Sequence, residues 1–149
     1  MIFLSKVKFK KLNNLAKTPT KGSEYAAGWD LYAATSYNIE IPPHETVKIG
    51  TGIAVALPEG LYGAICARSG LASKQGLRPA NCVGVVDSDY RGEVIVALHN
   101  DSDEPQIVSA GSRIAQFILT PFFDILWDEV EDLPETKRGE GGFGSTGTK

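Results

Sequence analysis

Hydrophobic residues recur at every second position along much of this chain, which is the period of a β-strand. Val7 and Phe9 alternate with lysines, and Val94, Val96 and Leu98 would lie on one face of a later strand. Short sequences rich in glycine, proline or aspartate separate such segments at 42–43, 58–60, 101–105 and 110–111. Many short strands with frequent turns predict an all-β sandwich or barrel.

Two further segments extend this pattern. Apolar positions alternate from Val47 to Leu57 across a glycine-marked break at 50–52. A short apolar run at 114–119 is closed by Pro121, which predicts another strand that ends there.

The length of 149 residues fits one domain with a sizeable core. The last block, 134–149, differs in composition, because it contains the glycine-rich sequence RGEGGFGSTG with a single phenylalanine. Glycine loses the most backbone freedom on ordering, so this block is not expected to fold alone. We expect a β domain at 1–133 and a mobile arm at 134–149 that closes over a ligand; a plain disordered tail is the alternative.

Composition narrows the class of partner. The hydrophobic content of 42% and charged content of 22% are ordinary for a globular protein, and the net charge of −3 argues against binding along a nucleic-acid backbone. A small anionic ligand remains possible, since a few arginines suffice for it. No stretch is long enough to span a membrane, and the first residues do not resemble a signal peptide, so a cytoplasmic protein is expected.

The cysteines and histidines do not form a metal-binding pattern. Cys66 and Cys82 lack the paired spacing of zinc ligands, and we expect two small buried side chains in a reducing cytoplasm. His44 and His99 each stand alone and are expected at the surface or half-buried.

The sequence RSG at 68–70 combines an arginine, a hydroxyl and a glycine before a predicted helix. Residues 69–76 contain good helix formers after a serine and end at a glycine, which predicts one or two helical turns. Free amides and the dipole at a helix start favour an anion. The alternative is a serine N-cap beside an ordinary surface arginine. The chain contains no Walker A loop.

The sequence GVVDSDYRGEV at 84–94 predicts a β-hairpin with Asp87 at its shoulder and Tyr90 at its tip. An aspartate directly behind valines would be partly desolvated, which raises the pKa of a carboxyl and makes it a better base. The alternative is that Asp87 and Asp89 form a turn while Tyr90 packs across the strands.

Two more segments carry polar groups in predicted strands. Asp30 lies between aromatic residues and requires a partner, either a buried arginine or an ion-bound water. Arg113 and Gln116 lie at the head of the apolar run. Together with 68–70, 84–94 and the glycine-rich block, these segments predict a site for a phosphorylated planar ligand.

Five sequences in this order, AGWDLYA, RSGLASKQG, GVVDSDYRGEV, GSRIAQ and RGEGGFGSTG, resemble the five motifs of the trimeric dUTPases. The resemblance implies an all-β, jelly-roll-like subunit, a distorted β-barrel with one short helix, and a homotrimer whose active sites are shared between chains. It implies hydrolysis of dUTP to dUMP and diphosphate with Mg²⁺, which keeps uracil out of DNA and supplies dUMP for thymidylate synthesis. Nucleic acids and membranes are not implied as partners.

The resemblance assigns roles to individual residues. Asp87 matches the aspartate that activates the attacking water, and Tyr90 matches the tyrosine that lies under the deoxyribose. Asp30 matches the first-motif carboxylate, near the metal through water or near a structural arginine. The remaining matches are the uracil pocket (Asn81, Val85, Val86 and Ile95), the phosphate binders (Arg68, Ser69, Gly70 and Gln116) and the arm (Arg138, Phe143, Gly144, Ser145 and Thr146). In the arm, Phe143 would stack on uracil while Arg138 and the hydroxyls hold the terminal phosphate.

Three positions depart from the family pattern. Ala67 replaces the usual proline, Ser112 replaces the usual aspartate, and Trp29 is bulkier than in many relatives. Two alternatives to the hydrolase are a dCTP deaminase-like enzyme and a catalytically idle nucleotide-binding regulator. A deaminase needs a glutamate near the pyrimidine, whereas this motif offers Asp87 followed by Tyr90.

Overall fold

The computed structural model of the protein describes residues 6–143, and these form eleven β-strands and one short α-helix. The strands are β1 (Lys8–Lys11), β2 (Thr20–Lys21), β3 (Trp29–Tyr32), β4 (Ile39–Ile41), β5 (Thr46–Ala56), β6 (Leu61–Cys66), β7 (Leu77–Pro79), β8 (Gly84–Val86), β9 (Glu93–Asn100), β10 (Gln106–Val108) and β11 (Arg113–Pro121). The helix is α1 (Ser69–Gln75).

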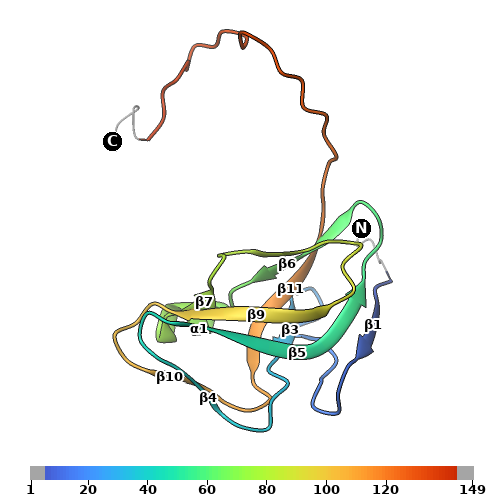
Figure 1. Cartoon of the computed structure of the whole chain (residues 1–149), viewed down its shortest axis with the longest axis vertical. Helices are drawn as coiled ribbons and strands as arrows, with labels where there is room; N and C mark the ends of the chain where they lie inside the picture. Colours follow the sequence, from blue (N-terminus) through green and yellow to red (C-terminus); the bar gives the residue numbers. More distant parts are fainter. Residues whose placement is uncertain (1–5, 144–149) are drawn as a thin grey trace.

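Two main sheets face each other and a small ribbon lies at one end (Figure 1). One sheet has the order β1-β5-β9-β7, the other has the order β2-β3-β11-β6-β8, and β10 pairs with β4. All of these pairs are antiparallel. The prediction of an all-β, jelly-roll-like fold with one short helix is therefore confirmed.

Alternation on the strands places the core between the sheets. Val94, Val96 and Leu98 of β9 are each at most 1% exposed, whereas Ile95 on the opposite face is 49% exposed. Burying each such aliphatic side chain contributes about 1.5–3 kcal/mol. The predicted face of this strand is confirmed, and the core continues through buried residues of β3, β5 and β11.

The glycine-marked break at 50–52 is a bulge inside one long strand, β5. The register against β9 shifts between Gly50 and Ala54, so three residues of β5 oppose a single residue of β9. Gly52 has a φ of 67°, a left-handed conformation that glycine adopts without a steric penalty. The bulge thus bends β5 without ending it.

The short helix α1 is confirmed where it was predicted, and its start differs in detail. Arg68 occupies the N-cap position and no side chain caps the first turn, so the serine N-cap is wrong. At the other end Gly76 adopts a left-handed conformation and donates its N–H to the carbonyl of Leu71. Across residues 6–143, no helix has the length and apolar character needed to cross a membrane.

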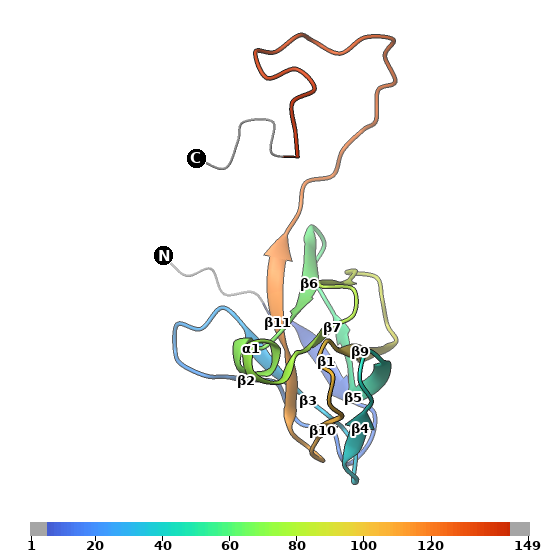
Figure 2. The same cartoon turned by 90° about the vertical axis from the view of Figure 1, so that its left-hand side faces the viewer.

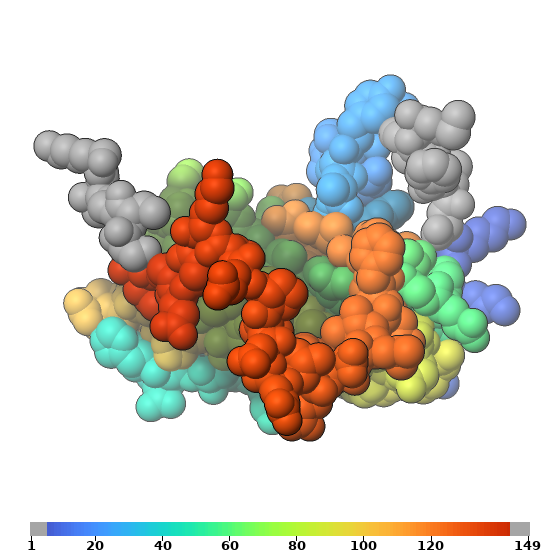
Figure 3. Space-filling view, turned by 90° about the horizontal axis from the view of Figure 1, so that it is seen from above, coloured from blue at the N-terminus to red at the C-terminus, as the bar shows by residue number. Residues whose placement is uncertain are grey.

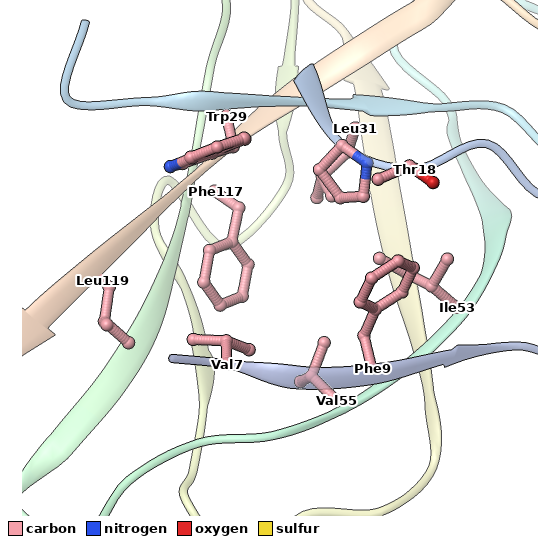
Figure 4. A pocket seen from close by; sticks show the side chains of 10 residues that line it. Val7, Phe9, Thr18, Trp29, Leu31, Ile53, Val55, Phe117 and Leu119 are labelled. Atoms are coloured by element: carbon pink, nitrogen blue, oxygen red, sulfur yellow. The ribbon is translucent and has the colours of Figure 1, made fainter. Parts of the chain in front are cut away.

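An apolar cavity of about 300 Å³ lies between the sheets beside β1 (Figure 4). Side chains of β1, β5, β3 and β11 point into it, among them Phe9, Val55 and Phe117, and Trp29 lies along its edge. Such a lining suits apolar side chains and not a charged nucleotide.

Beyond β11 the chain runs away from the sheets (Figure 2). Figure 3 looks down on this segment, orange to red, as a narrow winding chain and not as a packed layer. Phe122 is the last residue tied to the sheets, through its N–H to Gly60 and an edge-to-face contact with Tyr62. Within one subunit the packed part thus ends near Pro121, earlier than the boundary predicted at Leu133, which stays a prediction for the assembled protein.

The expectation that both cysteines are buried is wrong. Both thiols are free, Cys66 is half-buried at the end of β6, and Cys82 is exposed in the turn between β7 and β8. Cys82 has a φ of 61°, a left-handed conformation that this tight turn requires. His44 is exposed and His99 is half-buried, as expected.

Candidate nucleotide site

Three predicted site segments meet in one row across the five-stranded sheet. Gln116 of β11 lies opposite Asp30 of β3 on one side and opposite Cys66 of β6 on the other. Asp30 of the first motif and Gln116 of the fourth are therefore neighbours through backbone pairing, and Cys66, two residues before the second motif, lies beside them. Rigid strands hold such side chains more accurately than loops do.

Asp30 is held by two arginines. Its Oδ1 accepts from Nε of Arg68 at 3.0 Å and its Oδ2 accepts from Nη1 of Arg113 at 3.2 Å. The Asp30 side chain is 13% exposed, so the carboxylate requires these charge-assisted bonds. Of the two partners that the sequence leaves open for this residue, the structure contains the arginine.

The cluster of Asp30, Arg68 and Arg113, called here the arginine cluster, carries one negative and two positive charges. Arg68 uses Nε for Asp30, which leaves its terminal nitrogens for another acceptor. A cleft of about 340 Å³ lined by Arg68, Arg113 and Ser112 adjoins the cluster. With serine at 112 in place of the family's aspartate, no carboxylate opposes the residual positive charge from that position, and the arrangement favours an anion.

Gln116 is anchored before any ligand binds. Its Nε2 donates to the carbonyl of Ala67 at 2.8 Å, which ties β11 to the loop that carries Arg68. A Cβ placed on Gly28 would lie 2.4 Å from Oε1 of Gln116, so a side chain there would displace the amide from its place against the backbone. Gln116 thus supports the second motif, and its predicted contact with phosphate stays a prediction.

The start of α1 is open to a ligand. Ser69 and Gly70 are exposed, the first turn contains no acidic residue, and nothing lies within 4 Å of a Cβ placed on Gly70. Main-chain amides there can approach an oxyanion closely.

The segment 84–94 is not a β-hairpin, which corrects the prediction. β8 pairs with β6, whereas β9 pairs with β5 and β7, so the six residues 87–92 connect the two sheets. β8 pairs along its whole length with Gly63–Ile65 of β6, so it belongs to the five-stranded sheet, whereas β9 belongs to the other sheet. The expected desolvation of Asp87 is also absent, because this residue is exposed in the single subunit.

Tyr90 is fixed within this connection. Its N–H donates to the carbonyl of Asp87 at 3.2 Å, and its hydroxyl donates to the carbonyl of Glu93 at 3.0 Å. The side chain is not packed across strands and is 44% exposed. A flat, accessible aromatic face beside a carboxylate suits a sugar ring.

The residues predicted for the uracil pocket differ in exposure. Asn81, Val85 and Ile95 are exposed, whereas Val86 is 8% exposed and belongs to the core. Nδ2 of Asn81 lies 3.4 Å from where a Cβ on Gly84 would be, so the amide lies over the start of β8. Val86 can therefore contribute through its main chain.

Asp87 and Arg68 leave the sheet at opposite ends. β8 runs antiparallel to β6 with Val86 opposite Gly63, so Asp87 follows at one end while Arg68 follows Cys66 at the other. Gly63 and Cys66 alone are about 10 Å apart along the strand. The predicted base and the predicted phosphate binder of one subunit do not meet.

The described part of the arm makes only local contacts. Nε of Arg138 donates to the carbonyl of Gly141 at 2.7 Å, and Phe143 is fully exposed. Gly144, Ser145 and Thr146 lie outside the described residues. Among residues 6–143 no three His, Cys, Asp or Glu side chains gather into a metal cage.

Sequence reasoning missed Gly28, which leaves room for the amide of Gln116, and Glu93, whose Oε1 accepts from the N–H of Gly52 at 2.8 Å. Both stand inside quoted motifs, and glycines at 50, 52 and 92 were the available signal that side chains pass close to the backbone there.

An antiparallel β fold with two arginines on one carboxylate and an exposed tyrosine in a connecting loop has the chemistry expected of a protein for an anionic ligand that carries a sugar. A family model for dUTPase matches residues 14–147. The chain is 47% identical over 145 residues to the deoxyuridine 5'-triphosphate nucleotidohydrolase of Rickettsia felis, with 97% of this chain and 98% of that protein covered. A protein of the same name from Desulfitobacterium hafniense is 48% identical over 143 residues, with 95% of each covered. The chain belongs to the dUTPase family.

Two solved structures share the fold of this chain. A mutant dUTPase of Staphylococcus bacteriophage 80alpha, solved with dUpNHpp, has a TM-score of 0.84 at 27% identity, with 97% of this chain and 99% of that chain covered. A dUTPase of phage phi11 of S. aureus, whose structure describes a structural Mg(II) ion, has a TM-score of 0.75 at 23% identity, with 86% and 98% covered.

Proposed function

We propose that this protein hydrolyses dUTP to dUMP and diphosphate, with Asp87 as the base. The carboxylate accepts a proton from a water molecule while the water oxygen attacks the α-phosphorus. The bond from that phosphorus to the bridging oxygen breaks, and diphosphate leaves. The observation that carries the proposal is the arginine cluster, which supplies an anion site on rigid strands in a chain of this family.

The triphosphate is bound by Arg68, the amides at Ser69 and Gly70, and Gln116. Free guanidinium nitrogens and uncapped amides stabilise the charge that develops on phosphate oxygens. Arg138, with Ser145 and Thr146, adds contacts to the terminal phosphate when the arm closes. In that closed state water other than the nucleophile is excluded.

The nucleoside is bound by the other group of residues. Tyr90 lies under the deoxyribose and leaves no room for a 2′-hydroxyl, and Asn81 reads the pyrimidine edge together with main-chain groups of Val85 and Val86. Ile95 lines the pocket. Phe143 stacks on uracil, and Gly144, the next residue in the sequence, belongs to the same binding segment.

Mg²⁺ fits these residues as an ion carried by the substrate. It retains waters and binds through phosphates with one or two carboxylates, which does not require a cage made by protein alone. Both oxygens of Asp30 accept bonds from arginines, so this carboxylate would reach the ion only through water. When bound, the ion neutralises charge on the phosphates.

The active form is a homotrimer with sites shared between chains. Two features support this part of the proposal: Asp87 and Arg68 diverge within a subunit, and residues 122–133 expose large apolar side chains. Leu126 and Trp127 are 99% and 91% exposed. Exposure of such large apolar side chains to water is unfavourable in free energy unless another chain covers them.

The test is Asp87→Asn, with Asp89→Asn, a change at a neighbouring exposed carboxylate, as the matched control. Asp87→Asn keeps the shape and removes the base, so turnover of dUTP falls about 10²–10⁴-fold while binding of nucleotide persists. Diphosphate release with dUTP, dCTP, dTTP and UTP is measured with and without Mg²⁺. Unchanged turnover in Asp87→Asn contradicts the assignment, ammonia from dCTP indicates a deaminase, and binding without turnover indicates an idle regulator.

A further inference from the structure

Glu93 belongs to the third motif and has no role in the nucleotide site described above, yet its carboxylate makes a specific bond. It is the first residue of β9, directly after the connection that carries Asp87 and Tyr90. The side chain is half-buried, and Oε1 accepts from the backbone N–H of Gly52 at 2.8 Å.

This bond compensates for the bulge in β5. Where three residues of one strand oppose one residue of the other, main-chain groups lose their ladder partners. Two side chains replace those partners: Oγ1 of Thr51 donates to the carbonyl of Val94 at 2.6 Å, and Glu93 accepts from Gly52. A Cβ placed on Gly50 would lie 2.5 Å from Oε1 of Glu93, so this glycine makes room for the carboxylate.

The main chain of the same residue holds Tyr90. The Tyr90 hydroxyl donates to the carbonyl of Glu93, and a Cβ on Gly92 would lie 2.4 Å from that hydroxyl oxygen, so the ring rests against a bare glycine backbone. The carboxylate of Glu93 therefore fixes the start of β9 to β5, and its carbonyl fixes the ring to the start of β9.

We propose that Glu93 is a positioning residue that sets the depth of the Tyr90 ring and thereby the discrimination between deoxyribose and ribose. This inference rests on the proposed role of Tyr90 beneath the sugar. A 2′-hydroxyl adds a single oxygen, so a ring displaced by about 1 Å admits it, and misplacement on that scale changes rates by large factors.

The experiment compares kcat/KM for dUTP and for UTP in the full-length protein. Glu93→Ala lowers the dUTP-to-UTP ratio about tenfold, mainly by raising turnover of UTP. Glu93→Gln retains an Oε1 acceptor for Gly52 and keeps the ratio within about twofold of the starting protein. Glu40→Gln, at an exposed carboxylate of β4, is the matched control and leaves the ratio unchanged.

A double-mutant cycle separates positioning from general loosening. Tyr90→Phe removes the hydroxyl that ties the ring to Glu93, so adding Glu93→Ala to it lowers the ratio by less than Glu93→Ala does alone. A ratio that is unchanged in Glu93→Ala, or effects that multiply in the double variant, overturns the proposal.

Two further measurements cover failure of folding or of turnover. If Glu93→Ala does not fold, Gly50→Ala displaces the carboxylate from the opposite strand and must lower the ratio in the same direction. If the starting protein has no turnover, the hydrolase assignment fails, and the dissociation constants of dUMP and UMP give the ratio instead. An unchanged ratio in either case overturns the role of Glu93.

Discussion

The arginine cluster consists of residues from family motifs, and the C-terminal segment 122–143 leads into the last of these motifs. The two regions differ in the contacts that fix them to the rest of the subunit. Backbone pairing of β3 and β11 fixes Asp30 and Arg113, and direct ion pairs join both arginines to Asp30. Residues 122–143 form no strand or helix and expose nearly all of their large side chains. One part of the site exists in an isolated subunit, and the other lacks contacts that would hold it.

This difference assigns different physical roles to the two regions. The ion pairs of the arginine cluster are formed before any ligand binds, so the proposed phosphate site would need no reorganisation during the reaction. A segment without contacts gains order only on assembly or binding, and the conformational entropy lost then lowers the affinity. The same lack of contacts allows the segment to open for product release.

Of the changes that test this difference between the two regions, deletion of 138–149 is expected to have the largest effect on turnover. Turnover of dUTP falls about 100-fold or more, because water is no longer excluded and the triphosphate is misaligned. The melting temperature and oligomeric state stay unchanged, because residues 138–143, the described part of this block, make only local contacts. Calorimetry and sedimentation measure both; a chain that no longer folds would make the tail structural.

Asp30→Ala tests the arginine cluster. Removal of the shared carboxylate leaves two guanidiniums facing each other, and the free energy of unfolding falls by about 1–3 kcal/mol, a value reduced by the exposure of Arg113 at 49%. Urea titration measures the loss. Glu40→Ala serves as the control on an exposed strand position, and equal stability of both variants would mean that the cluster contributes nothing.

Gln116→Ala tests a single hydrogen bond beside the arginine cluster. Loss of the bond to Ala67 costs about 1 kcal/mol and lowers kcat/KM less than tenfold. Gly28→Ala displaces the same amide, so it should add little in the Gln116→Ala background. Full additivity of the two changes in urea titrations would separate Gly28 from this contact.

The smallest effect is expected at Asp101, which lies in neither region. Hydrogen bonding and attraction from Arg78 hold the pKa of Asp101 below its ordinary value of 3.8. Its stabilising effect is therefore complete above that pH and is lost as the pH falls through the lower, folded-state pKa. The difference in unfolding midpoint between the protein and Asp101→Asn should be small from about pH 3 to 7. This difference should narrow only at the acid end of the range. A difference that widens in acid would contradict the shift.

Sequence reasoning predicted the strand faces and the helix because both depend on local geometry. The pleat places Val94 and Val96 on one side, and Gly76 ends α1 in a conformation that glycine favours. It failed at 84–94, where the short polar stretch looked like a hairpin turn. Pairing there depends on β6, which takes β8 as its neighbour, and on β5, which takes β9.

The candidate site divides in the same way. Order and composition of the five motifs predicted which chemical groups take part, and the family assignment confirms that resemblance. Neither the partner of Asp30 nor the exposure of Asp87 followed from them, because each depends on which distant segments are neighbours.

The sequence by itself determined the chemical groups, the alternating faces and the turn positions, since these follow from side-chain identity and from the steric limits on a few adjacent residues. Only the tertiary structure decided that Asp30 faces two arginines, that Glu93 closes a bulge in β5, and that Asp87 and Arg68 leave the sheet at opposite ends. These relations come from long-range strand pairing, whose register is set by burial of the whole core and not by any local segment.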